Sequence, residues 1–307
     1  MTVAIITRTK NRPMLLKRAL KSVSIQDFND YVHIIVNDGG NENEIHELIQ
    51  QLPNNQQEKI LYLCNKTSIG MEASSNRAIQ ESNSEYIAFL DDDDTWEPNF
   101  LSTTIEFLDS HPNDMGITTK CNYIQEEICD GKAIILNSRP YKPHISSHSL
   151  YEICIENNIL NHSFVYRRSA LDTVGLYNET LKVLGDWDFN LRFLRQYDIP
   201  LLPARLANYH VRTAKSSHGN TITINIDLHK HTRMQINNRE LRKDLLEGSL
   251  GFGFLINASE PRINQNLGKK VMAGCIEVFN SFEIIQFIMR FFPNKHAKEL
   301  RNRFKSI

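Results

Sequence analysis

The stretch Tyr86-Ile87-Ala88-Phe89-Leu90-Asp91-Asp92-Asp93-Asp94-Thr95-Trp96 joins an apolar run to four consecutive acids. The apolar run has the length and composition of a buried strand in a parallel sheet. In open sheets of this kind, ligands gather at the carboxyl ends of the strands. Four adjacent carboxylates repel one another, and a divalent cation that carries phosphates would relieve the repulsion. The stretch therefore predicts an α/β sheet with a metal–nucleotide site at one edge.

Strand and helix patterns alternate through the first third of the chain. Apolar, β-rich runs at 3–7, 33–37, 60–64 and 86–90 are separated by helical patterns at 13–23, 44–51 and 72–81. This alternation predicts a mostly parallel sheet with helices on both faces. Asp38 follows the second run, so we expect it at the same edge of the sheet as the acidic run.

The middle of the chain has a different pattern. Two β-rich segments flank Asp130-Gly131, which is a hairpin signal. Ser169 is expected to cap a short helix that ends near Gly175. Asp186 opens a further helical stretch, with Trp187 on its apolar side.

Composition sets broad limits on function. Apolar residues make up 41% and charged residues 23% of the 307 residues, which is typical of a soluble globular protein. The net charge of −1 gives no general attraction to nucleic acid, which argues against a nucleic-acid partner. The first residues lack the pattern of a signal peptide, and the five cysteines lack CxxC spacing. We expect a cytoplasmic protein with reduced thiols.

Five motifs, in order, resemble glycosyltransferase family 2. They are Ile5–Pro13, Val36-Asn37-Asp38-Gly39-Gly40, Phe89–Trp96, Phe164–Ser169 and Gly185-Asp186-Trp187-Asp188-Phe189. The resemblance implies a GT-A fold, a Rossmann-like mixed and mostly parallel sheet flanked by helices. It also implies an inverting transfer from a nucleoside-diphosphate sugar, with a UDP-sugar favoured, to an acceptor hydroxyl. We expect a catalytic domain at 1–215, with a nucleotide-sugar half at 1–120 and an acceptor half at 121–215, and a helical extension at 216–307.

The resemblance also implies roles for the acidic run. Asp93 is the residue expected to reach a Mn²⁺ or Mg²⁺ ion, and Asp91 and Asp92 are expected to contact the nucleoside or the waters of the metal. In an extended segment, alternate side chains point to opposite sides, so a single cation cannot bind all four carboxylates. The alternative for the run is a solvated acidic turn. For Asp94 we favour a cap on the following helix.

Further donor contacts are implied by position in the family motifs. Thr7, Arg8 and Arg12 lie where the first loop of the family wraps the nucleotide. Asp38 is expected to accept hydrogen bonds from the base of the donor, although an Asx-type turn is the alternative. Asn76 is included with them, but the family commonly has arginine directly before it, and here that residue is Ser75. Arg77 lies about 100° further around the helix, so the diphosphate contact is expected either from Lys66 or Arg8 or not at all.

Asp186 is the expected catalytic base. Inverting transfer needs a carboxylate that takes the proton of the acceptor hydroxyl. The family usually has Glu-Asp at this site, whereas Gly185 stands here before Asp186. The alternative is that Asp186 caps its helix, and one residue can do both. Asp188 is expected to be structural.

Two histidines follow the last family strand, where related enzymes often place one near the diphosphate or the metal. His210 and His218 both fit, and we prefer His218 as a second metal ligand. The remaining histidines show no ligand-like spacing.

The end of the chain combines apolar and basic residues. A helical pattern at 271–292 is followed by a basic segment, which would suit a membrane surface and a lipid-linked acceptor. A helix packed on the catalytic domain is the alternative. A peripheral contact with the inner face of the membrane is therefore one of two expectations.

The expected function is transfer of a sugar to a glycan or lipid-linked glycan, in bacterial surface polysaccharide synthesis. A sugar-phosphate nucleotidyltransferase is the alternative enzyme, but the segment 7–13 lacks the glycine-rich loop of that class. A non-catalytic scaffold is the other alternative, and the presence of both Asp93 and Asp186 argues against it.

Overall fold

A computed structural model of the chain describes residues 1–129, 132–212 and 226–259. The chain divides into two compact units, Met1–Asn237 and Asn238–Ile307. The expected domain boundary near residue 215 falls outside the described residues and stays a prediction, as does the helix at 271–292. Among the described residues, no helix has both the length and the apolar character needed to cross a membrane.

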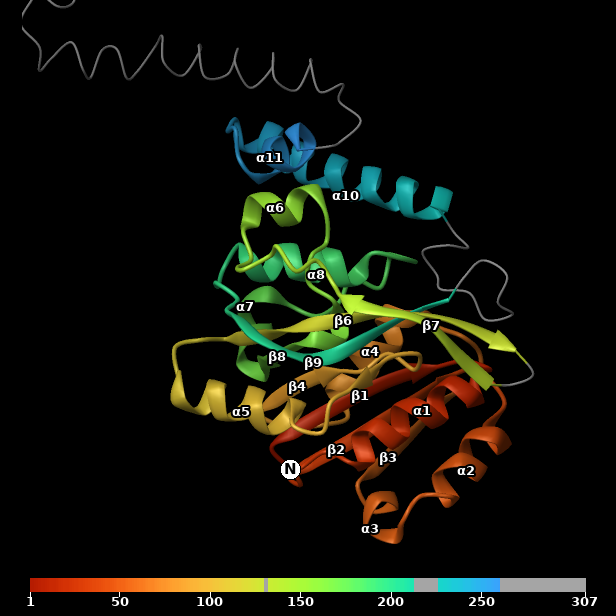
Figure 1. Cartoon of the computed structure of the whole chain (residues 1–307). Helices are drawn as coiled ribbons and strands as arrows, with labels where there is room; N and C mark the ends of the chain where they lie inside the picture. Colours follow the sequence, from red (N-terminus) through yellow and green to blue (C-terminus); the bar gives the residue numbers. More distant parts are fainter. Residues whose placement is uncertain (130–131, 213–225, 260–307) are drawn as a thin grey trace, which may run out of the picture. The chain divides into compact units, whose positions relative to one another are not determined.

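The elements follow the alternating order that the sequence predicts, and Figure 1 labels them along the chain. The strands are β1 (Val3–Thr9), β2 (Tyr31–Asp38), β3 (Ile60–Asn65), β4 (Tyr86–Phe89), β5 (Thr95–Trp96), β6 (Gly116–Cys129), β7 (Lys132–Pro140), β8 (Phe164–Arg167) and β9 (Leu201–Arg212). The helices are α1 (Pro13–Ser24), α2 (Glu42–Gln50), α3 (Asn54–Gln57), α4 (Met71–Gln80), α5 (Phe100–Ser110), α6 (Leu150–Ile155), α7 (Leu171–Val174), α8 (Gly185–Leu194), α10 (Ile226–Glu247) and α11 (Phe252–Ala258), with short 3₁₀ turns η1 (Asn161–Ser163) and η2 (Arg168–Ala170).

The strands form one mixed sheet in the order β3-β2-β1-β4-β8-β6-β9-β5, and β7 pairs with β6. Neighbours among β1 to β4 run parallel, whereas β8 is antiparallel to both β4 and β6. β9 runs parallel to β6 and antiparallel to β5. The α/β fold with a mostly parallel first half is therefore confirmed, and its parallel strands end at one edge.

The pleat of β1 determines which side chains reach which face of the sheet. Val3 and Ile5 are fully buried in a core that includes Ala19 and Val23 of α1. Because side chains alternate along a strand, residue 8 points to the opposite face, where α4 packs on β1. Arg8 accordingly donates a hydrogen bond to Ser75 of α4, 3.1 Å away. The strand therefore delivers Arg8 to the end of the sheet where β4 finishes.

Helix α8 is fixed by a buried aromatic core. Phe189 and Phe193 pack with Tyr166 of β8, and Phe189 stacks on Tyr177 with ring centroids 4.5 Å apart. Trp187 donates a hydrogen bond to the carbonyl of Ile153, 2.7 Å away. These contacts hold the first turn of α8, which carries Asp186, against the sheet.

Two local expectations are wrong. Ser169 lies inside η2 and caps no helix, because α7 begins only at Leu171 after Ala170. The helix after the acidic run begins at Phe100, and its cap position is Asn99. Asp94 therefore does not cap that helix. The short strand β5 lies between Asp94 and α5, and it pairs with β9.

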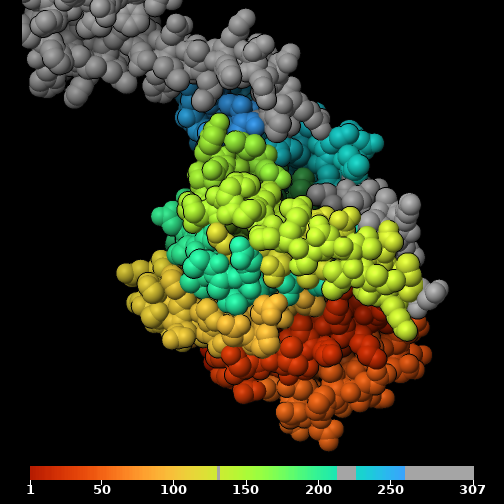
Figure 2. Space-filling view, viewed as in Figure 1, coloured from red at the N-terminus to blue at the C-terminus, as the bar shows by residue number. Residues whose placement is uncertain are grey.

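The β6–β7 hairpin is confirmed, although its turn at 130–131 lies outside the described residues. Figure 1 shows β7 at one side of the sheet, and every β7 residue is exposed to solvent. In Figure 2 the yellow-green hairpin lies on the surface of the molecule. The first residues of β6 are buried and the later ones are mostly half-buried, but Glu126 in this later part is a fully buried polar residue.

The aromatic core of α8 gives a direct stability prediction. Phe193 is fully buried and packs against Phe164 and Tyr197. The Phe193→Ala substitution should lower the free energy of unfolding by about 3–5 kcal/mol, because it removes an aromatic ring and leaves a cavity. Urea denaturation followed by circular dichroism measures the change. The exposed Tyr151→Ala variant is the control, and an equal loss in both variants would contradict this packing account.

Candidate active site

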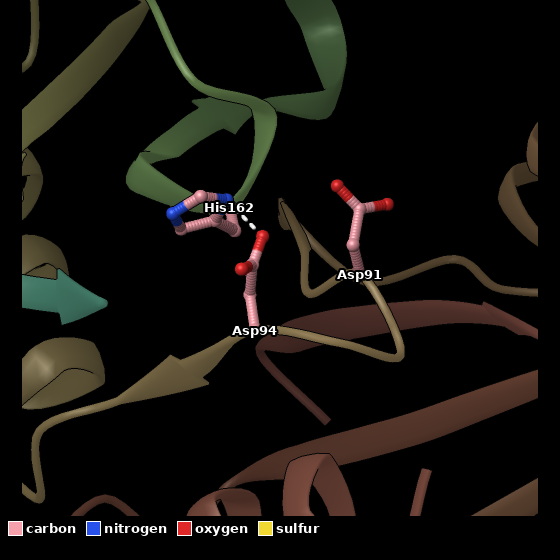
Figure 3. Close-up of side chains that lie close together, drawn as sticks. All are labelled: Asp91, Asp94 and His162. Atoms are coloured by element: carbon pink, nitrogen blue, oxygen red, sulfur yellow. Dashed lines mark ion pairs between the residues drawn. The ribbon is translucent and has the colours of Figure 1, made fainter. Parts of the chain in front are cut away.

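The four aspartates form a tight turn and not an extended strand. The amide of Asp94 donates a hydrogen bond to the carbonyl of Asp91, 3.1 Å away. The expectation that alternate carboxylates point to opposite sides is therefore wrong. The turn brings the first and the fourth carboxylates together, and oxygen atoms of Asp91 and Asp94 lie within 4.8 Å of each other and of a ring nitrogen of His162. Figure 3 shows the three side chains around one space.

Every aspartate of the turn has a cationic partner from another element. Asp91 pairs with Arg8 at 2.6 Å, Asp92 with Arg12 at 3.2 Å, Asp94 with His162 at 2.7 Å, and Asp93 with Arg212. Arg212 is almost fully buried, so its charge requires a partner of opposite sign. The sequence separates these partners widely, but the fold gathers them around four residues.

Burial and neighbouring charges shift the pKa values of the acids in the turn in different directions. Burial and the neighbouring carboxylate raise the pKa of both Asp92 and Asp93. Burial also acts on Asp94, but the adjacent His162 outweighs it and lowers the pKa of Asp94. Burial opposes the charge on His162, yet Asp94 raises the pKa of His162 well above its ordinary value. The turn therefore contains one firmly ionised carboxylate, Asp94, paired with a protonated imidazole.

Glu126 of β6 lies behind the turn and binds residues that contact it. It is fully buried and accepts hydrogen bonds from two nitrogens of Arg18, at 2.6 and 3.1 Å, and from Nδ1 of His210 at 2.9 Å. Arg18 also donates to the carbonyl of Asp93, 2.5 Å away, and the amide of His210 donates to Oδ1 of Asp94 at 2.8 Å. Glu126 therefore fixes Arg18 and His210, and these two residues bind the backbone of Asp93 and the side chain of Asp94. Although burial opposes ionisation, His210 and Arg18 lower the pKa of Glu126 to about 2.

Asp186 lies in the first turn of α8, as the sequence predicts. Its carboxylate accepts a hydrogen bond from Nδ2 of Asn157, 2.8 Å away. Burial raises the pKa of Asp186, and the charge of Asp91 raises it further, whereas Arg8 acts in the opposite direction. The electrostatic coupling between Asp186 and Asp91 indicates that the expected base and the acidic turn belong to one site.

Arg8 connects the two parts of this site. Besides Asp91, its Nη1 lies 3.6 Å from Oε2 of Glu72, a buried acid of α4. Burial raises the pKa of Glu72 to about 7, and the charge of Asp186 also raises it, although Arg8 opposes the shift. Arg77, by contrast, bonds to the carbonyl of Cys64 and to Asn65, so it faces away from Arg8 and its partners.

Several side chains that are expected to contact the donor form hydrogen bonds within the protein. Asp38 accepts four hydrogen bonds, all from Asn65 and from the loop at 68–70. The side chain of Thr7 is buried against Nε2 of His33, 2.9 Å away. Asn76 bonds to the backbone of Tyr177 with both ends of its amide. Lys66 is exposed on the loop after β3. Their roles toward a donor stay predictions, whereas Arg8, Arg12, Asp91 and Asp92 do lie together.

The expected metal ligands are arranged differently in the structure. The carboxylate of Asp93 lies against Arg212 and, at 3.5 Å, Arg12, and it is not part of the Asp91–Asp94–His162 group. His218 lies outside the described residues. Both ring nitrogens of His210 are engaged, with Glu126 and with Thr95. Asp93 as a metal ligand therefore stays a prediction.

Sequence reasoning missed His162, Glu126, Arg18 and the role of Arg212. His162 lies in η1, directly before β8, and the indole nitrogen of Trp96 donates to its carbonyl at 2.6 Å. Its position beside Asp94 depends on the pairing of β8 with β4, which no local spacing encodes. The one available signal was its location two residues before the Phe164–Ser169 motif.

The model of the family described as glycosyl transferase family 2 matches residues 4–175. The chain belongs to glycosyltransferase family 2. The match covers the acidic turn and its neighbours, although it ends before Asp186. The prediction of a glycosyltransferase is therefore confirmed at the level of the enzyme class.

Relatives and solved structures agree with this membership. The chain is 29% identical over 202 residues to WcaA of Escherichia coli K12, which is named for glycosyl transfer in colanic acid biosynthesis; the match covers 64% of this chain and 68% of that protein. A Campylobacter jejuni β-1,3-glucosyltransferase, named for a GalNAc(5)-diNAcBac-PP-undecaprenol substrate, is 32% identical over 105 residues, covering 34% of this chain and 33% of the relative.

The structure of TarS 1-349 from S. aureus in complex with UDP-GlcNAc has a TM-score of 0.59 and 19% identity, covering 78% of this chain and 67% of that one. The match to a longer TarS chain covers only 40% of that chain. At this level of identity, the likeness confirms the fold, in agreement with the expected GT-A class.

Glu126 gives a prediction that joins charge to stability. At pH 7, Glu126→Gln should lower the free energy of unfolding by about 3–5 kcal/mol, because it leaves buried cations without their counter-ion. The folded pKa of Glu126, about 2, lies below its ordinary value of 4.5, so its charge stabilises the fold above pH 4.5 and this contribution is lost toward pH 2. The difference between wild type and variant should therefore shrink between these values.

Urea denaturation at a series of pH values measures the effect of Glu126→Gln. Glu106→Gln, at an exposed site on α5, is the matched control and should change stability little at any pH. A Glu126→Gln loss that is equally large at pH 7 and at pH 3 would contradict the electrostatic account.

Proposed function

We propose that this enzyme transfers a sugar, with inversion, from a nucleoside-diphosphate sugar to a hydroxyl group of a glycan or lipid-linked glycan. The observation that carries the proposal is the pairing of the acidic turn with Asp186 across Arg8. A donor diphosphate suits the turn and its cations, and an acceptor hydroxyl suits a carboxylate of raised pKa. The turn and its cations would thus bind the leaving diphosphate, and Asp186 would activate the attacking hydroxyl.

The residues of the turn fit a divalent cation. Asp91 and Asp94 offer carboxylate oxygens, the donors preferred by Mg²⁺ and Mn²⁺, in the group that also contains His162. Asp94 is ionised and Asp91 is partly exposed, so the two together can hold an ion that also binds phosphates once the ion displaces the proton of His162. When bound, the cation would supply charge neutralisation for the departing diphosphate. We therefore propose Asp91 and Asp94 as holding residues, with Asp93 in support.

Arg8 and Arg12 are proposed to orient the diphosphate. Both are held in place by the acids of the turn, and Arg12 is more exposed than Arg8, with 27% against 13% of the side chain accessible. An arginine held by a carboxylate at one end can present its remaining N–H groups to phosphate oxygens. This role replaces the arginine that the family commonly has where Ser75 stands.

Asp186 is proposed as the general base. The hydrogen bond from Asn157 and the backbone amide of Trp187 orient the carboxylate, which in its ionised form can accept the proton of the acceptor hydroxyl. The raised pKa brings the group closer to the range in which a carboxylate is an effective base at neutral pH.

The donor and acceptor classes are proposed from the relatives. TarS is described in complexes with UDP and with UDP-GlcNAc, which supports a UDP-sugar as donor. The Campylobacter jejuni relative is named for a polyprenol-linked glycan, and the Escherichia coli relative for colanic acid biosynthesis. These names favour an acceptor in glycan assembly, and we propose surface polysaccharide synthesis as its setting. Contact of the basic end of the chain with a membrane is part of this proposal and concerns residues outside the described part.

Replacing Asp186 tests the proposed chemistry. Asp186→Asn should lower kcat by roughly 10²–10⁴-fold, because the amide cannot take the acceptor proton. Binding of the UDP-sugar should change little, since Asn157 can still bond to the oxygen of the new amide. Release of UDP in the presence of acceptor measures kcat, and calorimetry measures donor binding.

The exposed Asp172→Asn, on α7, is the matched control. Wild-type turnover by a folded Asp186→Asn enzyme would refute the assignment of the base.

A further inference from the structure

Gly185, the first residue of α8, is packed directly against Glu72 of α4. A Cβ atom at position 185 would lie 2.0 Å from Oε1 of Glu72 and 2.4 Å from its Cδ. Gly185 has no positive φ angle, so its backbone conformation is one that any residue adopts. Glycine is therefore required here by the Glu72 side chain and not by the backbone.

The carboxyl group of Glu72 is buried at the start of α8. Only 4% of Glu72 is exposed, and the amide of Gly185 donates a hydrogen bond to it. Its Oε2 atom is buried and accepts no hydrogen bond from the described residues, while Arg8 Nη1 lies 3.6 Å away. Such a buried and incompletely satisfied carboxyl group costs stability, so packing alone does not account for it.

The resemblance implies a glutamate directly before the aspartate of this motif. In this chain the residue before Asp186 is glycine, and the Glu72 carboxyl group lies where a side chain at 185 would begin. An acid from α4, in place of one from α8, therefore lies close enough to Asp186 to interact with its charge.

We infer that Glu72 supplies from α4 the carboxyl group that position 185 lacks, and acts as a positioning residue for Asp186. The inference rests on the proposed function of Asp186 as base. Glu72 accepts a hydrogen bond from one of the first amides of α8, which have no partner within their helix. It also faces the guanidinium of Arg8, which pairs with Asp91. Glu72 therefore positions the backbone at the start of α8, which carries Asp186. It also positions the guanidinium of Arg8, which pairs with Asp91.

The first experiment separates positioning from binding. With the full-length enzyme, Glu72→Gln should lower kcat on the order of 10²-fold, which is the cost of a slightly misplaced catalytic group, while KM for the UDP-sugar changes much less. Glu81→Gln, at the exposed end of α4, is the matched control and should behave as wild type. Turnover by Glu72→Gln equal to that of wild type would overturn the inference.

The second experiment moves the acid back to α8. Gly185→Ala should lower the melting temperature of the wild-type protein, because the new Cβ overlaps Glu72, and should be tolerated in a Glu72→Ala background. The double variant Glu72→Ala/Gly185→Glu should recover at least tenfold of the kcat lost in Glu72→Ala, because a carboxyl group again stands beside Asp186. Equal destabilisation by Gly185→Ala in both backgrounds, or no recovery by the double variant, would overturn the inference.

The two experiments distinguish this inference from the proposed function. If wild type releases no UDP from a UDP-sugar with or without acceptor, the proposed function fails, and the melting temperatures still test the overlap of position 185 with Glu72. If wild type turns over and the Glu72 variants match it, the function stands and the positioning role is refuted.

Discussion

The structure depends on neutralising four adjacent carboxylates in a buried turn. Buried charges are costly unless they are paired, and each acid of the turn has its own cation. The cations come from β1, the residue before α1, β9 and η1, so the turn cannot form until distant parts of the chain have come together. Glu126 in turn balances Arg18 and Arg212 and accepts a hydrogen bond from His210. The acidic motif is therefore also a structural junction, and its chemistry cannot be separated from the fold around it.

Secondary structure explains how the reactive groups meet. The pleat of β1 points Arg8 toward α4, and the end of β4 delivers the turn to the same edge of the sheet. The aromatic core beneath α8 holds its first turn, where Leu184 adopts a left-handed conformation with φ of 62° just before the helix. Strained backbone of this kind is common beside functional residues, and here it directly precedes Gly185 and Asp186. Rigid elements thus place the two halves of the proposed reaction.

The sequence predicted features that are local or that repeat with a regular period. Strand–helix alternation, the helix of Asp186 and the acidic run followed from apolar patterns and motif order. The conformation of the run was misjudged, because a hydrogen bond from Asp94 to Asp91 overrides the extended geometry that the preceding strand suggests. His162 and Glu126 could not be predicted, since each acquires its role only through the pairing of strands distant in sequence. The sequence showed only that glycine stands at position 185, before Asp186. That Glu72 packs against this glycine follows from the folded structure alone.

The central claim is that the Asp91–Asp94 turn binds the diphosphate of the donor through a divalent cation. Calorimetric titration of UDP into the full-length protein, with Mn²⁺ and then with EDTA, tests this claim most directly. Asp94→Asn is the informative variant, because asparagine can still accept the hydrogen bond from the His210 amide while losing the charge; the exposed Asp27→Asn is its control. The account predicts that EDTA and Asp94→Asn each weaken UDP binding at least tenfold, about 1.4 kcal/mol, and that Asp27→Asn does not. UDP binding of equal strength with Mn²⁺, with EDTA and in Asp94→Asn would contradict it.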